Sequence, residues 1–225
     1  MSNEERRETR EEGLAPVPPQ EELLIAIERY LAAGVRLGTR VSNAYLQRRG
    51  FVFSVRPDGL RILNLRKIDE RIRIAAKMIA MYDPEKVVAY SAKPYGFKPV
   101  EMFCRFVRCK AITGRFVPGT FTNPNLNHYI ETDLLISTDP KADAQAIEEA
   151  ARMGIPVIAL VDTDTPISYV DLIIPCNNKG RRSLALMYWL LARQVLRVRG
   201  ELKESEDLPV PPEEFEVKVT VEGIS

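Results

Sequence analysis

Residues 154–189 read GIPVIALVDTDTPISYVDLIIPCNNKGRRSLALMYW, and they contain the clearest fold signals of the chain. Two short apolar runs of strand-forming residues, 157–161 and 172–174, each end in a polar loop. The second loop, residues 177–182, leads directly into an apolar helix expected over residues 183–199. Short apolar strands without alternation that are separated by helices indicate a parallel sheet covered on both faces.

Strand and helix patterns alternate upstream of this stretch as well. Strands are expected over residues 87–90, 111–113 and 134–137, and helices over residues 99–107 and 142–153. The second of these helices is expected to take Asp139 as its cap, with Pro140 in the first turn. The chain is therefore predicted to have an α/β fold built on a parallel sheet.

The residues before position 87 predict a hairpin and two helices. Residues 51–55 and 60–63 flank the turn sequence Arg56-Pro57-Asp58-Gly59, which is typical of a β-hairpin. A short helix is expected over residues 22–33, ending at the glycine that follows, and a longer one over residues 65–79.

The 225 residues favour one domain with a tail at each end. We expect an acidic, proline-containing N-terminal tail over residues 1–21, a single α/β domain over 22–200 and an acidic C-terminal tail over 201–225. Both tails are expected to be extended and flexible. In the second tail, apolar residues alternate with polar ones from Phe215 to Val221, which favours a strand that needs a partner to pair with.

The net charge of the whole chain is near neutral, but its central part is basic. Between residues 23 and 200 the chain has 27 basic residues and 16 acidic ones, and 22 of all 32 basic residues are arginine. Arginine binds phosphate bidentately and stacks on bases, so this composition favours a nucleic-acid partner. A thermostable domain with many ion pairs is the alternative interpretation.

Histidine and cysteine are too few for most metal sites or His-dependent catalysis. His128 is the single histidine, and Cys104, Cys109 and Cys176 form no CxxC pair. No apolar run reaches the ~18 residues that a membrane helix needs, and the first residues are too charged for a signal peptide. We therefore expect a cytoplasmic protein with reduced thiols and no metal, cofactor or membrane partner.

An aspartate motif offers an enzymatic alternative. Asp162-Thr163-Asp164-Thr165 follows a strand and resembles the first motif of haloacid-dehalogenase-type phosphatases, in which the first Asp attacks phosphorus beside Mg²⁺. That motif normally ends the first strand and has an acidic pair downstream, and this chain has neither. A strand-end turn closed by Pro166 is favoured, and a Mg²⁺-dependent phosphatase using Asp162 and Asp164 remains the alternative.

The candidate RNA-binding residues are basic side chains beside aromatics, at the ends of a short strand, or at a helix start. They are Arg36, Arg40, Arg48, Arg49, Lys110, Arg115, Lys179, Arg181 and Arg182. The first four are interleaved with Tyr45, Phe51 and Phe53, a combination that suits an RNA surface. The last three precede or open the final helix, where cations oppose the helix dipole unless an anion such as phosphate binds.

Five motifs lie in an order that points to a known family. They are Tyr30-Leu31-Ala32-Ala33-Gly34-Val35 with Gly38-Thr39; Gly114-Arg115-Phe116-Val117-Pro118-Gly119-Thr120-Phe121-Thr122-Asn123-Pro124; Thr138-Asp139-Pro140-Lys141-Ala142-Asp143 with Ala146-Ile147 and Glu149-Ala150; Gly154-Ile155-Pro156-Val157 through Val161-Asp162-Thr163; and Asp171-Leu172 through Ile174-Pro175 with Asn177-Asn178-Lys179-Gly180. Together they resemble the archaeal form of the second small-subunit ribosomal protein, whose eukaryotic relative is the SA protein, or laminin-receptor precursor. The resemblance covers about residues 22–200.

The resemblance implies a flavodoxin-like three-layer sandwich with five parallel strands and an attached hairpin. It also implies a structural role without enzymatic activity or small-molecule substrate, in contact with small-subunit ribosomal RNA and neighbouring ribosomal proteins. The family sits on the solvent side of the subunit, between head and body near the messenger exit. This chain departs from the family pattern at Arg36, where relatives often have His, and it has no helical-hairpin insertion between Asn125 and Asp133.

Overall fold

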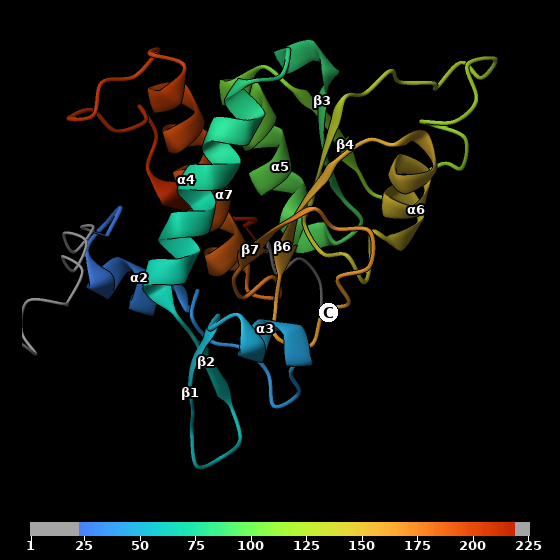
Figure 1. Cartoon of the computed structure of the whole chain (residues 1–225). Coiled ribbons are helices and arrows are strands. Elements are labelled where there is room, and N and C mark those ends of the chain that lie inside the picture. Colours follow the sequence, from blue (N-terminus) through green and yellow to red (C-terminus); the bar gives the residue numbers. More distant parts are fainter. Residues whose placement is uncertain (1–22, 219–225) are drawn as a thin grey trace, which may run out of the picture.

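A five-stranded parallel sheet forms the centre of the computed structural model, which describes residues 23–218 (Figure 1). The strands are β3 (Val87–Ser91), β4 (Lys110–Thr113), β5 (Leu134–Ser137), β6 (Val157–Val161) and β7 (Leu172–Pro175). Their order across the sheet is β4-β3-β5-β6-β7, and every neighbouring pair is parallel. This is the strand order of flavodoxin-like folds, so the predicted fold class is confirmed.

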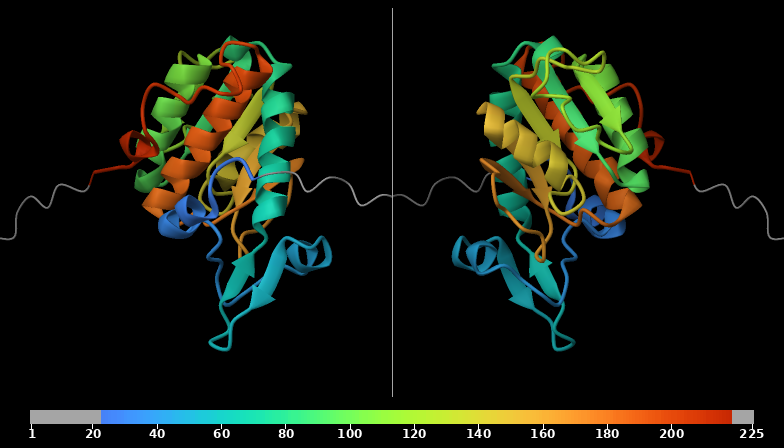
Figure 2. Two further views of the ribbon diagram at one scale, coloured as in Figure 1. Left: turned by 90° about the vertical axis from the view of Figure 1, so that its left-hand side faces the viewer. Right: turned by 90° about the vertical axis from the view of Figure 1, so that its right-hand side faces the viewer.

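Helices cover both faces of the sheet and make three layers (Figure 2). One face carries α4 (Leu65–Ala80), α5 (Pro94–Val107) and α7 (Arg181–Val198), and the other carries α6 (Ala144–Met153) and the short α3 (Ala44–Arg48). Successive residues of a strand point to opposite faces, so β6 serves both cores. Its Ile158 and Leu160 belong to the larger core, while Ala159 and Val161 pack on the face of α3.

A hairpin stands apart from the central sheet. It consists of β1 (Val52–Val55) and β2 (Arg61–Leu63), which pair antiparallel across the predicted turn at residues 56–59. An additional bridge joins Leu37 to Ile62, so the chain leading to α3 runs beside the hairpin. Helix α3 was not predicted, because five residues are too few for a helical hydrophobic pattern to be visible.

Four helix starts differ from the expected positions. Helix α7 begins two residues early, at Arg181. Helix α2 (Ile27–Ala33) begins five residues late, although it ends as expected at the left-handed Gly34. Helix α5 begins five residues early, because Pro94 occupies the first turn, where proline fits, and Pro99 is tolerated inside the helix. Helix α6 begins two residues late: the Asp139 carboxylate caps Lys141 in a preceding turn and does not cap the helix.

Residues 201–218, here called the C-terminal strap, return to the domain surface. Leu208 and Phe215 of the strap are both buried in the larger core. The Trp189 indole N–H on α7 donates to the Val210 carbonyl at 2.8 Å. The strand expected from residue 215 onward is wrong for its described part, since Phe215 ends a 3₁₀ turn, η2 (Pro212–Phe215). Residues 219–225 of that expectation lie outside the described residues.

A buried arginine joins the strap to the start of the described chain. Arg193 on α7 donates to the Leu24 carbonyl at 2.6 Å, and its Nη1 lies 2.7 Å from Asp207 Oδ1. Its guanidinium also lies over the Trp189 ring, 4.8 Å from the centroid. These contacts offset the cost of burying the Arg193 charge, and they fix the strap along α7.

Candidate nucleic-acid interface

Residues 36–64, here called the basic arm, comprise α3, the hairpin and the segment that leads to them. Figures 1 and 2 show the hairpin projecting away from the layers of the sandwich. The basic arm contains six arginines and a single carboxylate, Asp58. A projecting element with this charge balance is the electrostatic footprint of a phosphate-binding surface.

Most arginines of the basic arm are available to a partner. Arg40, Arg48, Arg49 and Arg56 are exposed, while Arg36 and Arg61 are half-buried. Of these six arginines only Arg56 pairs with a carboxylate among the described residues 23–218, its Nη2 lying 3.2 Å from Asp58 Oδ2. The structure therefore brings together the four predicted arginines of this region and adds Arg56 and Arg61, which the sequence interpretation missed. The near absence of acidic residues between positions 36 and 64 is the sequence feature that could have identified Arg56 and Arg61.

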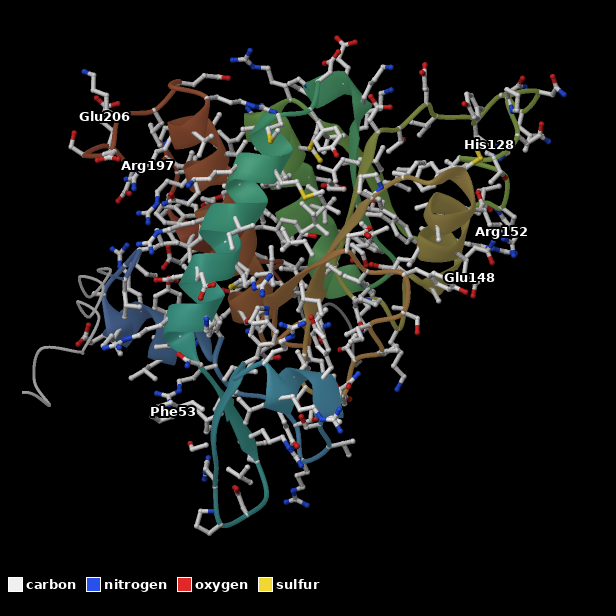
Figure 3. The ribbon with its side chains drawn as sticks, in the orientation of Figure 1. Phe53, His128, Glu148, Arg152, Arg197 and Glu206 are labelled. Carbon is white, nitrogen blue, oxygen red and sulfur yellow. The ribbon has the colours of Figure 1, made fainter. Side chains whose placement is uncertain are left out.

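Aromatic and aliphatic side chains are exposed among these arginines. Phe53 and Val41 are each 67% exposed, and the Arg49 guanidinium lies 5.4 Å from the Tyr45 ring centroid. Figure 3 shows Phe53 pointing away from the hairpin. Single-stranded RNA is bound by stacking on such aromatic rings and arginine planes, with cations holding the phosphates. The combination therefore suits RNA better than a purely ionic partner.

A cleft of about 400 Å³ lies at the base of the hairpin. Phe53 lines it together with Arg36 and Arg66. Arg66 stands in the first turn of α4 and is exposed. Its position beside Arg36 extends the basic surface beyond the arm onto α4.

The aspartate motif after β6 anchors the basic arm to the sheet. The Thr39 N–H donates to Thr163 Oγ1 at 2.8 Å, and the Asn43 N–H donates to the Thr163 carbonyl at 2.7 Å. Asp162 and Thr165 close the turn, since the Asp162 N–H donates to Thr165 Oγ1 at 3.2 Å. The motif thus acts as the strand-end turn favoured from the sequence, and it also positions the arm.

The loop after β7 holds the chain just before the arm. The Asn177 N–H donates to the Val35 carbonyl at 2.9 Å, and Asn177 Nδ2 donates to the Gly34 carbonyl at 3.2 Å. Asn178 is fully buried, and its Nδ2 donates to the Leu160 carbonyl of β6 at 3.0 Å. Both polar loops of the stretch 154–189 therefore attach the basic arm to the carboxyl ends of β6 and β7.

Substitution of Gly38 tests this attachment. A Cβ atom on Gly38 would lie 2.6 Å from Thr163 Cγ2 and 3.0 Å from the Arg61 carbonyl oxygen. We expect Gly38→Ala to lower the unfolding free energy by about 1–3 kcal/mol, measured by urea denaturation, and to speed amide exchange at Thr39 and Asn43.

The matched control is the double variant Gly38→Ala, Thr163→Ser. Serine removes the clashing methyl group and keeps the hydroxyl that accepts from Thr39, so the double variant should regain part of the lost stability. A Gly38→Ala protein as stable as the parent, with unchanged exchange at Thr39, would contradict the proposed contact.

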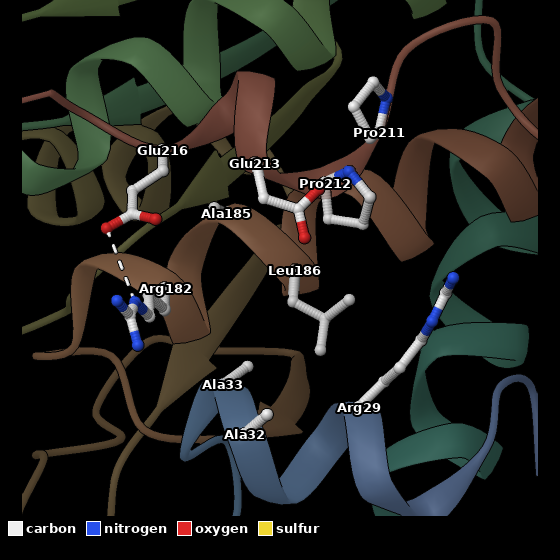
Figure 4. Close-up of a pocket in the computed structure, with 10 residues that line it drawn as sticks. All are labelled: Arg29, Ala32, Ala33, Arg182, Ala185, Leu186, Pro211, Pro212, Glu213 and Glu216. Atoms are coloured by element: carbon white, nitrogen blue, oxygen red, sulfur yellow. Dashed lines mark ion pairs between the residues drawn. The ribbon is translucent and has the colours of Figure 1, made fainter.

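The cations at the start of α7 are paired within the chain. Lys179 Nζ lies 2.6 Å from Asp164 Oδ2 and 3.6 Å from Asp162 Oδ2. Glu216 of the strap contacts both arginines: its Oε1 lies 2.8 Å from Arg181 Nε and 3.8 Å from Arg182 Nε. Figure 4 shows the pair with Arg182. The chain therefore supplies carboxylate partners to these cations, so their position does not by itself require an external anion.

The geometry around Asp162 does not favour phosphoryl transfer. Asp162 is 1% exposed, and burial raises the pKa of its carboxyl to about 6, although the Thr163 N–H and Lys179 oppose the rise. An aspartate nucleophile needs an ionised oxygen open to substrate. The second carboxylate, Asp164, is engaged by Lys179. The pairing of Asp164 with Lys179 therefore favours a structural role for this turn.

Lys110 and Arg115 lie apart from the basic arm and from each other. Lys110 begins β4 and Arg115 follows its carboxyl end, and both side chains are exposed. Strand β4 is the sheet edge three strand spacings from β6, about 14 Å away. The nine predicted residues thus form three groups: the arm, the two ends of β4, and the start of α7.

The carboxyl ends of β3 and β5, where flavodoxin-like folds bind ligands, are occupied by the chain itself. The buried Asp143 carboxylate accepts from the Ala92 N–H at 2.8 Å, from Ser137 Oγ at 2.7 Å, and from two further backbone N–H groups. Lys93 forms an ion pair with Asp139 beside it. The place between β3 and β5 where the strand order reverses is therefore filled by hydrogen bonds and an ion pair within the chain.

The buried Asp143 should make stability depend on pH. Burial raises the pKa of this carboxyl from 3.8 to about 6, while its hydrogen bonds limit the rise. Between these two values the folded state binds a proton that the unfolded state lacks, so this contribution to stability is lost as pH rises from about 4 to about 6. We expect Asp143→Asn to have a shallower pH dependence of the urea midpoint over this range. An unchanged dependence would show that Asp143 does not carry the effect.

Comparison with known proteins identifies the family. The sequence model of the family described as ribosomal protein S2 matches residues 126–197. A protein of Pyrobaculum aerophilum named small ribosomal subunit protein uS2 is 70% identical over 200 residues, which cover 89% of this chain and 96% of that protein. The protein of the same name from Caldivirga maquilingensis is 67% identical over 88% of this chain and 93% of its own length. This chain therefore belongs to the ribosomal protein S2 family.

The family is also recognised at lower identity. The uS2 protein of Staphylothermus marinus is 60% identical over 89% of this chain and 90% of its own length. The resemblance to the archaeal form of the second small-subunit ribosomal protein is thus confirmed. Among residues 23–218, none of the helices is both long and apolar enough to cross a membrane.

Proposed function

We propose that this protein is a structural constituent of the small ribosomal subunit and acts in translation without catalysing a reaction. The observation that carries the proposal is the 70% identity to a small-subunit protein over 96% of that protein's length. The projecting basic arm supports the proposal independently, since it presents unpaired arginines to solvent. Cytoplasmic ribosomes are the corresponding location.

We infer that small-subunit ribosomal RNA binds mainly at the basic arm. Arg36, Arg40, Arg48 and Arg49 were predicted there, and the neighbouring Arg56 and Arg61 enlarge the set. The support is the exposure of Arg40, Arg48, Arg49 and Arg56, and the aromatic side chains among the arginines. Of the six arginines, only Arg56 has a carboxylate partner among the described residues. Lys110 and Arg115 are secondary candidates.

Lys179, Arg181 and Arg182 are also weaker candidates for phosphate contact than the arm. Their carboxylate partners reduce the electrostatic gain from an added phosphate. Arg182 remains the best placed of the three, with its side chain 67% exposed and its distance to Glu216 the longer one.

Neighbouring ribosomal proteins are proposed partners of the segments at both ends. The folded unit extends beyond residue 200, because the strap contributes Leu208 and Phe215 to the core. Residues 1–21 and the last residues after the strap are then the proposed tails. The N-terminal tail has six glutamates and three arginines among residues 1–21, and this acidic composition would suit basic partners.

Sedimentation of a cell extract tests the proposed function. In a low-salt sucrose gradient the native protein should travel with the small subunit and with whole ribosomes. Washing the particles with increasing salt should release it, because phosphate contacts weaken as salt rises. A protein that stays in the ribosome-free fractions at low salt would refute the proposal.

A further inference from the structure

Two of the three cysteines meet at the end of α5. Cys104 lies in the last turn of the helix and Cys109 lies just before β4. Their Sγ atoms are 2.8 Å apart, and the Cys109 N–H donates to the Cys104 carbonyl at 3.1 Å. Arg108 ends the helix in the left-handed conformation with φ 63°, which turns the chain back over the helix end. The backbone itself therefore holds the two thiols together.

The two thiols differ in access. Cys104 is 4% exposed and packs in the larger core, and burial raises the pKa of its thiol. Cys109 is half-buried and stands between two exposed cations, Arg108 and Lys110. Cys176, the third cysteine, is fully buried in the loop after β7. An external reagent therefore meets Cys109 first, and Cys104 is the adjacent second thiol.

We propose that Cys104 and Cys109 form an intramolecular disulfide by exchange with a small disulfide oxidant. The Cys109 thiolate attacks one sulfur of the oxidant and releases one thiolate from it, which leaves a mixed disulfide on Cys109. The Cys104 sulfur then attacks the Cys109 sulfur, gives up its proton and expels the second half of the oxidant. Two protein thiols become one disulfide, and one oxidant disulfide is reduced to two thiols.

The disulfide would lie where the end of α5, the start of β4 and the residues that follow α7 are in contact. Arg199, at the end of α7, donates from Nη1 to the Val107 carbonyl at 2.8 Å, and Arg108 Nη2 lies 2.7 Å from Glu201 Oε2. A covalent link between the end of α5 and the start of β4 restricts the unfolded chain. We expect the oxidised protein to unfold about 5 °C above the reduced protein.

Peptide mapping of the full-length protein tests the proposal. The reduced protein is treated with oxidised glutathione, quenched with acid, alkylated after unfolding and digested with trypsin. Trypsin cuts after Arg105 and Arg108, so the bridge joins two separate peptides, and the intact protein is lighter by two hydrogen atoms. Cys176→Ala should keep the joined peptides and Cys109→Ala should lose them.

The contrary outcomes are equally distinct. A persistent glutathione adduct on Cys109, a disulfide between two chains, or three alkylated thiols after oxidation would each overturn the proposal. Joined peptides with an unshifted unfolding temperature would overturn the stabilising role of the bond.

Discussion

Replacing Arg40, Arg48 and Arg49 with alanine is expected to lower affinity for small-subunit ribosomal RNA about 100-fold near physiological salt. All three side chains are exposed on the basic arm and have no carboxylate partner among residues 23–218. Each phosphate contact contributes close to one counterion to the salt dependence of binding. The slope of log affinity against log salt should therefore become shallower by about 2 to 3.

The matched control removes the same charge from the opposite end of the sheet. Lys77, Arg105 and Arg152 are exposed and lie in the last turns of α4, α5 and α6. These turns are distant from the carboxyl ends of the strands, where the arm is attached. Replacing the three by alanine should change affinity and salt slope little. An equal loss of RNA affinity in the two triple variants would mean that binding depends only on the net charge of the domain.

Replacing Phe215 with alanine is expected to lower the unfolding free energy by about 3–5 kcal/mol. Phe215 is 0% exposed and stacks on Phe106 of α5, with ring centroids 5.9 Å apart and planes inclined by 10°. Its removal would leave a cavity between α5, α7 and the strap. Urea denaturation of the purified chain gives the free energy directly, provided that the transition stays two-state.

Glu214 provides the control for Phe215. It lies in the same 3₁₀ turn and its side chain is exposed, so Glu214→Ala should change stability by less than about 0.5 kcal/mol. If Phe215→Ala were as harmless as Glu214→Ala, the strap would not be part of the folded unit. The expected difference between the two variants thus locates the end of the domain.

The central sheet was predictable because its signals are local. Four of the five strands are short, mainly apolar runs bounded by polar or helix-forming residues, and these four are buried throughout. The hairpin was equally visible, since Arg56-Pro57-Asp58-Gly59 is a turn sequence whatever lies around it. Helix starts were less predictable. Asp139 was expected to cap α6, but the helix begins after Asp143, whose carboxylate instead accepts hydrogen bonds from Ala92 after β3 and Ser137 of β5.

The strap was unpredictable for a different reason. Its composition is acidic and rich in proline, which is typical of flexible tails. The structural role of three strap residues depends on partners in α5 and α7, which are distant in the sequence. These residues are Phe215, Leu208 and Asp207. The same long-range pairing placed Glu216 beside Arg181 and changed the interpretation of that helix start.

The arginines of the candidate site were predictable as residue types but not as a surface. Arg36, Arg40, Arg48 and Arg49 could be selected because aromatics accompany them. That they project from the sandwich depends on Thr163 and Asn177, which hold the base of the arm at the sheet. A motif that suggested catalysis from its sequence therefore supports the element that is proposed to bind RNA.

The most direct test of this account compares the parent chain and the variant lacking Arg40, Arg48 and Arg49 in one extract. Both carry a tag, and their distribution is followed through a low-salt sucrose gradient. The parent chain should sediment with the small subunit, while the variant, folded by circular dichroism, should remain largely in the ribosome-free fractions. Equal incorporation of the two proteins would contradict the claim that the basic arm binds this chain to the ribosome.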